Sequence, residues 1–223
     1  AGQTRRVEAS LVVVSCGAVN SAALLLRSDS TRHPAGLANS SGLVGRRYMA
    51  HLATMMAGFH PFRRNQTVFQ KTVAINDFYL QGSDVPYPLG QIQSQGRTHG
   101  VMAKTAAPWM PSWFFDYWVA RGVDWLAMTE DLPSRDNRVV LDGSGRIQLC
   151  YTANNVTAHE RLVQEVRRML RGLGLVITYA HAGSTQNTTH QCGTVCFGTD
   201  PRTSVLDSYC RAHDVENLFV VDA

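Results

Sequence analysis

Apolar positions along the chain predict a strand followed by a helix near its start. Residues 11–14 are a continuous, mostly β-branched apolar run, which is typical of a strand covered on both faces. A turn of small residues follows at 15–17, and Asn20 or Ser21 can cap a helix that carries the apolar run 22–26. Free backbone N–H groups at such a helix start suit a phosphate or a dinucleotide, although many similar turns serve close packing alone.

The middle of the chain predicts both strands and helices. Residues 49–59 are apolar and fit a strand or a helix, and residues 67–80 alternate as in a strand with one polar face. Residues 137–152 predict a hairpin, with Asp-Gly-Ser-Gly at 142–145 as its turn. Residues 157–174 predict the clearest helix, because apolar positions recur at helical spacing and glycines stand at its end.

Two further stretches complete the expected organisation. Residues 105–126 hold closely spaced aromatic side chains, which predict a pocket lining, a core helix or a helix packed on a partner. Residues 217–223, NLFVVDA, predict a buried return strand. The resulting order, a strand–helix unit, a long mixed region and a return strand, predicts an α/β fold with an α+β insertion. We also expect the chain to be a piece of something larger, since domains seldom end on a bare core strand.

Composition narrows the classes of function. The 223 residues are 44% hydrophobic and 17% charged, as in an ordinary globular protein. The net charge of +4 is spread along the chain and forms no basic face for nucleic acid. No apolar run reaches the roughly 18 residues of a membrane span, and no signal peptide is visible. Five cysteines, an odd number, favour reduced thiols in a cytoplasmic protein. From the charge and the apolar runs we expect neither nucleic-acid nor membrane partners.

The stretch TTHQCGTVCFGTDPRTSVLD, residues 188–207, concentrates the candidate chemistry. His190, Cys192, Cys196 and the later Cys210 are zinc ligand types. Alternatively, either of the first two cysteines could act as a nucleophile beside His190. His190 could also be a general base that accepts a hydroxyl proton, because an ordinary imidazole titrates near neutral pH. The residue pattern alone leaves these alternatives and a purely structural histidine open.

Four segments, in order, resemble signatures of the glucose–methanol–choline (GMC) oxidoreductases. HQCGTVCFGTDPRTSVLDSYCRAHDVENLFVVDA, at 190–223, resembles the C-terminal signature of that family, and VVVSCGAVNSAALLLRSDS, at 12–30, resembles its second signature. LANSSGLVGRRYMAHL, at 37–52, is similar to the loop that follows, and LPSRDNRVVLD, at 132–142, to a segment entering the substrate domain. TVFQKTVAINDFYL and TTHQCGT also resemble the pyranose-oxidase-like branch of sugar oxidases.

This resemblance implies part of an FAD-binding, Rossmann-like domain and a substrate domain with a mostly antiparallel sheet backed by helices. The implied boundaries are 1–50 for the FAD-binding part, 51–185 for the substrate domain, and 186–223 for the return to the first domain. The implied reaction passes hydride from the carbon of a sugar or sugar-like alcohol to FAD, with His190 as the base. The implied cofactor-binding residues are Cys16, Gly17, Ala18, Asn20, Asp222 and Ala223.

The chain also departs from the family pattern. It lacks the Gly-x-Gly-x-x-Gly fingerprint for the ADP half of FAD, and it ends before the position of a second catalytic residue. We therefore expect it to be inactive alone and to need these segments, from its own longer chain or from a second chain. Its other partners would be the alcohol and an electron acceptor, oxygen or another. The remaining alternatives are a zinc-stabilised interaction module and a non-catalytic subunit or truncated remnant of the family.

Overall fold

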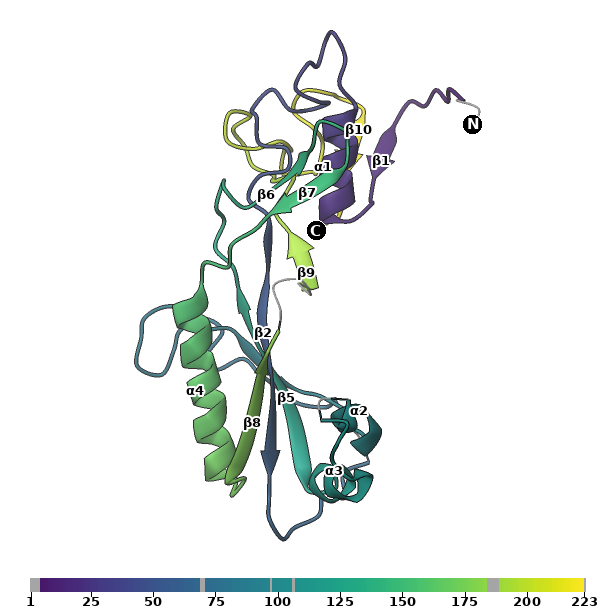
Figure 1. The fold of residues 1–223 in the computed structure, drawn as a ribbon. Coiled ribbons are helices and arrows are strands. Elements are labelled where there is room, and N and C mark those ends of the chain that lie inside the picture. The colour runs from purple at the N-terminus through teal and green to yellow at the C-terminus, as the bar shows by residue number, and fades with distance from the viewer. Residues whose placement is uncertain (1–4, 69–70, 97, 106, 184–188, 223) are drawn as a thin grey trace. The chain divides into compact units, whose positions relative to one another are not determined.

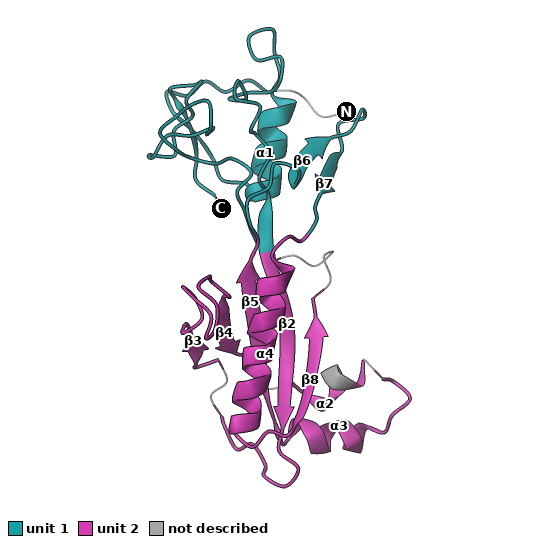
Figure 2. Cartoon of the chain, turned by 90° about the vertical axis from the view of Figure 1, so that its left-hand side faces the viewer, with its two compact units in different colours: residues 1–50, 132–152, 189–223 teal, residues 51–131, 153–188 magenta. Residues whose placement is uncertain are grey.

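The computed structural model describes residues 5–68, 71–96, 98–105, 107–183 and 189–222 (Figure 1). It separates into two compact units (Figure 2). Unit 1 holds residues 1–50, 132–152 and 189–223, and unit 2 holds residues 51–131 and 153–188.

The elements follow one another in the order β1 (Val12–Val14), α1 (Ala18–Arg27), β2 (Met49–Phe59), β3 (Ala74–Ile75), β4 (Gln91–Ser94), α2 (Gly100–Lys104), α3 (Ser112–Val119), β5 (Gly122–Glu130), β6 (Arg138–Leu141), β7 (Ile147–Cys150), α4 (Val156–Gly172), β8 (Ile177–Ala182), β9 (Thr189–Cys192) and β10 (Leu218–Val220). Within the described ranges, none of these helices has the length and apolar character that crossing a membrane requires.

Unit 1 is built around α1. β1 and β10 pair in parallel, with Val14 opposite Val220, so the two ends of the chain meet in one small sheet. The predicted hairpin is confirmed as β6 and β7, and β6 contacts α1. For this reason residues 132–152 join unit 1, whereas the sequence had placed them in the substrate domain. Leu25, Tyr48 and Val139 are buried together in this core.

The prediction that the first strand is covered on both faces is wrong for the described chain. Val14 is buried, but Leu11, Val12 and Val13 are 52%, 44% and 53% exposed. The physical reason is that β1 pairs with β10 alone, whereas parallel strands are normally flanked and covered.

Unit 2 is an antiparallel sheet backed by α4. The strand order is β3-β4-β5-β2-β8, and residues 49–59, which fitted either a strand or a helix, form β2. Met56 of β2 packs with Leu162 and Val166 of α4 in the core. The long helix predicted at 157–174 is confirmed as α4, because its apolar stripe meets the sheet.

Residues 67–80 do not form the predicted strand. Within the described part of this segment only Ala74–Ile75, β3, pairs as a strand. The backbone N–H groups of Thr72 and Val73 donate to Ser94 Oγ at 3.1 and 3.0 Å, and a turn follows at Asn76. The hydrogen bonds to the Ser94 hydroxyl and the turn at Asn76 therefore take the place of the longer strand pairing that the alternating pattern predicts.

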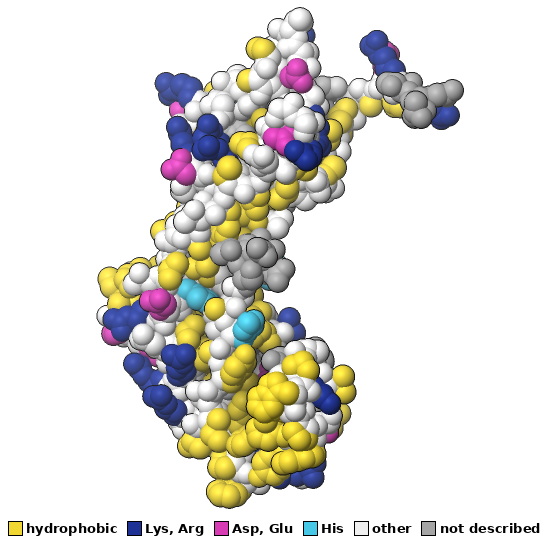
Figure 3. Space-filling view, viewed as in Figure 1, with side chains coloured by type: hydrophobic (Ala, Val, Ile, Leu, Met, Phe, Trp, Pro, Cys, Tyr) yellow, Lys and Arg dark blue, Asp and Glu magenta, His cyan; other side chains and the backbone are white. Residues whose placement is uncertain are grey.

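The central part of the aromatic stretch forms a short surface helix, α3, so the core helix, one of the three alternatives for this stretch, is wrong. None of its residues is buried, and Trp113 is 70% exposed. Figure 3 shows hydrophobic side chains gathered where α2 and α3 lie in Figure 1. Edge-to-face ring contacts, such as Phe114 with Trp118, and the Arg121 guanidinium 3.6 Å above the Tyr117 ring centre hold the aromatic groups together.

α4 also places one imidazole between two hydroxyl groups of the sheet. His159 Nε2 lies 2.7 Å from Thr54 Oγ1, and His159 Nδ1 lies 3.0 Å from Thr129 Oγ1. Thr129 donates its only hydroxyl proton to the carbonyl of Leu89 at 2.7 Å, so it accepts from Nδ1–H, and Nε2 then accepts from Thr54. Burial lowers the pKa of His159 from 6.5 to about 4, in agreement with this neutral tautomer.

This half-buried histidine predicts a pH-dependent stability. As the pH falls from 6.5 to about 4, the unfolded chain takes up a proton at His159 that the folded chain does not. The free energy of unfolding should therefore fall in this window, by at most about 1.4 kcal/mol per pH unit from this group. Urea unfolding of wild type and His159→Gln at several pH values should show the smaller slope in the variant. Exposed His99→Gln is the control, and equal slopes in wild type and His159→Gln would contradict the prediction.

Candidate cofactor and catalytic site

The turn between β1 and α1 carries most of the predicted cofactor-binding residues. Gly17 is the N-cap of α1, with φ of 81°, and no side chain caps the helix. A Cβ built on Gly17 would meet no atom within 4 Å. Glycine is therefore favoured here by backbone conformation, and the surface in front of the turn is open.

Asp222 fastens this turn from the other end of the chain. Its Oδ2 accepts hydrogen bonds from the backbone N–H groups of Cys16 and Gly17 at 2.8 and 2.9 Å, and from the hydroxyl of Ser21. Because β10 pairs with β1, the residues just after β10 arrive beside the turn just after β1. One carboxylate oxygen thus holds three donors of the turn.

Two expectations about the turn are wrong. The N–H groups of Cys16 and Gly17 are not free for a phosphate, because both donate to Asp222. Neither Asn20 nor Ser21 is the N-cap, because α1 already begins at Ala18. The sequence alone does not show this, since the acceptor lies at the far end of the chain.

The residues predicted to border a cofactor differ in accessibility. Cys16, Gly17 and Asn20 are exposed, whereas the side chain of Ala18 is buried. Asn20 Nδ2 donates to the carbonyl of Cys16 at 3.4 Å. Ala223 lies outside the described residues.

The HQCGT stretch packs against the same turn. Gly193 has φ of 91°, and a Cβ on it would lie 2.3 Å from the carbonyl oxygen of Arg47, so only glycine fits. Thr194 is buried, and its Oγ1 donates to the carbonyl of Ala18 at 2.5 Å. The backbone N–H of Gly45 donates to the carbonyl of Thr194 at 2.7 Å. Sequence reasoning missed Thr194, because its partners are distant in the chain.

His190 is exposed in β9, three residues before Gly193. Its φ of 54° lies in the left-handed region, which histidine adopts more readily than most residues and which recurs at functional sites. β9 and α1 are in contact. The structure therefore brings the strand of the predicted base and the predicted cofactor-binding turn together within unit 1.

The metal alternative does not fit the geometry. Among the described residues, which include His190, Cys192, Cys196 and Cys210, no three possible ligands of His, Cys, Asp or Glu type cluster. Cys196 Sγ instead lies 3.6 Å from an Arg47 guanidinium nitrogen that donates to it. The zinc-stabilised module is therefore wrong for this structure.

The Asp-Pro part of the stretch has a structural role. Hydrogen bonds from Arg202 hold the pKa of the Asp200 carboxyl below its ordinary value. The backbone carbonyl of Asp200 accepts from Ser204 Oγ at 2.8 Å, and that hydroxyl lies 2.9 Å from His213 Nε2. These contacts close the loop that follows HQCGT.

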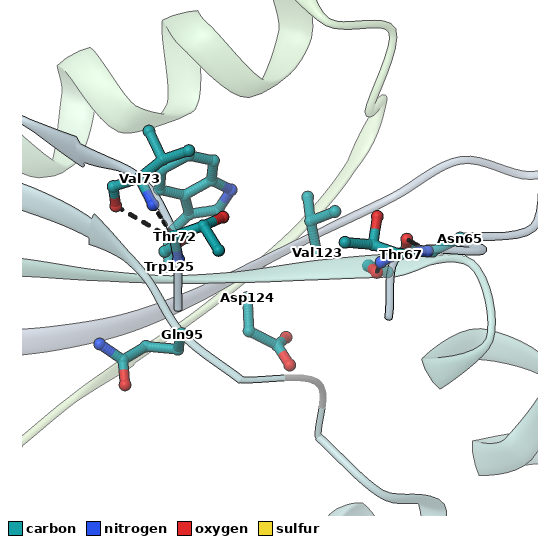
Figure 4. A pocket seen from close by; sticks show the side chains of 10 residues that line it. Asn65, Thr67, Thr72, Val73, Gln95, Val123, Asp124 and Trp125 are labelled. Atoms are coloured by element: carbon teal, nitrogen blue, oxygen red, sulfur yellow. Dashed lines mark hydrogen bonds between the residues drawn. The ribbon is translucent and has the colours of Figure 1, made fainter. Parts of the chain in front are cut away.

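Unit 2 contains a separate hollow of about 190 Å³ between the ends of β4 and β5 (Figure 4). Thr67, Thr72 and Asp124 are among its lining residues, and Asp124 Oδ2 accepts from the backbone N–H of Thr98 at 2.7 Å. Trp125 and Gln95 also line it, but their N–H groups without a partner are buried away from the surface. These donors therefore cannot contact a molecule in the hollow without a rearrangement.

The residues at the α1 turn fit one edge of a cofactor better than a phosphate. The turn has open space at Gly17, and the first helical turn carries no side-chain cap, so backbone N–H groups there can face an electron-rich edge. The two N–H groups of Cys16 and Gly17 are already occupied. A phosphate grip would need the fingerprint that this sequence lacks.

Comparisons with known proteins agree with the sequence resemblance. Residues 133–223 match the family model described as GMC oxidoreductase. The chain is 32% identical to paromamine 6'-oxidase of Streptomyces fradiae, over 98% of this chain and 41% of that protein. It is also 32% identical to 6'''-hydroxyparomomycin C oxidase of Streptomyces lividus, over 99% of this chain and 41% of that protein.

A third relative is 2-methyl-1,2-propanediol dehydrogenase of Mycolicibacterium austroafricanum, 30% identical over 99% of this chain and 44% of that protein. The chain thus spans less than half the length of these relatives. Among solved structures, a formate oxidase variant of Aspergillus oryzae RIB40, studied for FAD modification, matches with a TM-score of 0.58. It shares 13% identity over 96% of this chain and 49% of that one, so this likeness concerns the fold alone.

The close approach at Gly193 predicts a large loss of stability on substitution. Gly193→Ala combines left-handed strain, about 1–2 kcal/mol, with a clash against the Arg47 carbonyl. Gly145→Ala is the matched control, because Gly145 has φ of 78° but open space around it. Urea unfolding should show Gly193→Ala losing about 1 kcal/mol or more beyond the control. Equal losses would mean that the loop moves away from Arg47 without cost.

Proposed function

We propose that this chain belongs to the GMC oxidoreductase family, whose model matches residues 133–223, and that it contributes the family's C-terminal domain to an FAD-dependent enzyme. That enzyme oxidises an alcohol group of a sugar or sugar-like substrate. The observation that carries the proposal is the tether between the HQCGT stretch and the first turn of α1. Thr194 bonds to Ala18, and Gly193 packs on Arg47, so His190 stands on a strand fixed beside the open turn.

The chemistry assigned to His190 is that of a general base. An imidazole nitrogen of His190 accepts the proton of the substrate hydroxyl, which makes the adjacent C–H bond a better hydride donor. FAD, when bound, supplies the acceptor for that hydride. The alcohol loses one proton and one hydride and becomes a carbonyl compound, so atoms and electrons balance.

The substrate class is proposed from the relatives. Two of them are named as oxidases of paromamine and of a hydroxyparomomycin, and a third as a dehydrogenase of a small diol. The second and third names, of a hydroxyparomomycin and a propanediol, are those of compounds that bear hydroxyl groups, which supports an alcohol or sugar-like substrate. Because both oxidases and a dehydrogenase are represented, the electron acceptor is proposed only as oxygen or another oxidant.

For cofactor binding we assign Cys16, Gly17, Ala18 and Asn20 to the edge of FAD, with Ala18 acting through its backbone because its side chain is buried. Asp222 would support the turn from behind, and Ala223 follows it. The grip on the ADP half would come from residues outside these 223, in the same protein or a second chain. The exposed faces of β1 support this, because further strands and helices normally cover a parallel sheet. The cytoplasmic location proposed from the cysteines is compatible with five free thiols.

Replacing the base tests the proposal. In the purified flavin-loaded protein, His190→Ala should lower the rate of flavin reduction by alcohol by about 10² to 10⁴, the usual worth of a positioned base, with flavin content unchanged. The rate is followed by flavin absorbance after anaerobic mixing with sugars, amino sugars and diols.

His99→Ala, an exposed histidine of unit 2, is the control and should react like wild type. The complete protein, with the residues that grip the ADP half, is the one to test. If it shows no flavin spectrum, or if its His190→Ala variant oxidises alcohol undiminished, the proposed function is refuted.

A further inference from the structure

We propose that Thr194 is a positioning residue, whose hydroxyl group sets where His190 stands relative to the first turn of α1. This inference rests on the proposed function, because it concerns the geometry of the same reaction. It assigns a task to a residue that touches neither the substrate nor, by its burial, the cofactor: the side chain is 1% exposed.

A hydrogen bond from the hydroxyl group of Thr194 joins its segment to α1. Thr194 Oγ1 donates to the carbonyl of Ala18 at 2.5 Å, across 176 positions of the chain. A hydroxyl group has one proton, so this bond uses the full donor capacity of the side chain. The bond therefore joins the segment of the base to the first residue of α1.

The backbone around Thr194 is also held on the side away from α1, by the loop at 45–47. The N–H of Gly45 donates to the carbonyl of Thr194, and Gly193 lies against the carbonyl of Arg47 with no room for a Cβ. The segment is thus wedged between the 45–47 loop and α1. The hydroxyl of Thr194 is the side-chain contact that fixes the α1 side of the wedge.

Thr194 lies close to the proposed base along the chain. Only three residues lie between His190 and Thr194, and β9, which carries His190, contacts α1. A displacement of residues 193 and 194 should therefore also displace the imidazole of His190. Proton removal and hydride departure need correct alignment, and a displacement near 1 Å can cost about 100-fold in rate.

Three variants test this inference in the flavin-loaded protein. Thr194→Val keeps the shape but removes the donor, Thr194→Ser keeps the donor, and Thr203→Val is the matched control. Thr203 is exposed on the same loop and also donates to a backbone carbonyl, that of Asp200 at 3.3 Å. The measurements are the limiting rate of flavin reduction, its dependence on alcohol concentration, and the kinetic isotope effect with alcohol deuterated at the reacting carbon.

The expected result is a split between the variants. Thr194→Val should reduce the limiting rate by about 10- to 100-fold with little change in the alcohol concentration for half-saturation, and with a larger isotope effect. Thr194→Ser and Thr203→Val should stay within about threefold of wild type. If Thr194→Val fails to retain flavin, Thr194→Cys, a weaker donor of similar size, takes its place.

The failures are distinguishable. A wild-type protein that no alcohol reduces would overturn the proposed function and this inference with it. A reactive wild type with Thr194→Val, or its Cys replacement, within threefold would overturn this inference alone. A Thr194→Ser variant as slow as the valine variant would also overturn it, because the hydroxyl would then not be what places the base.

Discussion

The first turn of α1 is the point on which the organisation of unit 1 depends. Asp222 accepts from the N–H groups of Cys16 and Gly17 on one side, and Thr194 donates to the carbonyl of Ala18 on the other. Both partners come from the last segment of the chain, so these bonds close unit 1 across the inserted residues of unit 2. The bond between Thr194 and Ala18 is buried, and a buried polar group that loses its partner costs about 1–3 kcal/mol, which is significant against the small net stability of a folded domain. The bonds from Cys16 and Gly17 to Asp222 are exposed, so each contributes less.

In this arrangement one group, the carboxylate of Asp222, stabilises the turn, and a different part of the turn is open for binding. An anion at a helix N-terminus is favourable, and here the carboxylate of Asp222 is that anion for the turn just before α1. The remaining open surface at Gly17 can then face a cofactor without also having to stabilise the turn. In unit 2 no such bond is needed to hold α4, because its apolar stripe is buried against β2 and β5.

The sequence predicts those elements whose pattern is local. The hairpin at 137–152 and the helix at 157–174 form where expected, because turn residues and helical spacing act over a few positions. The strand expected at 67–80 fails because Ser94, from another segment, accepts the backbone donors of Thr72 and Val73. At the site, the residues of the turn before α1 can be predicted from the sequence resemblance of residues 12–30. The bonds of Asp222 and Thr194 are not, because their partners lie 206 and 176 positions away.

Within the HQCGT stretch some residues have structural roles, and one has a proposed chemical role. Its cysteines suggest a metal, yet among the described residues no ligand cluster forms, and Cys196 contacts Arg47 instead. Gly193 is there because Arg47 leaves no space for a Cβ, and Thr194 because a buried carbonyl on α1 faces it. His190, three residues before Gly193, is exposed and has a left-handed backbone. The proposal that His190 is the base rests on this exposure and on the contact between β9 and α1, while Gly193 and Thr194 hold the segment in place.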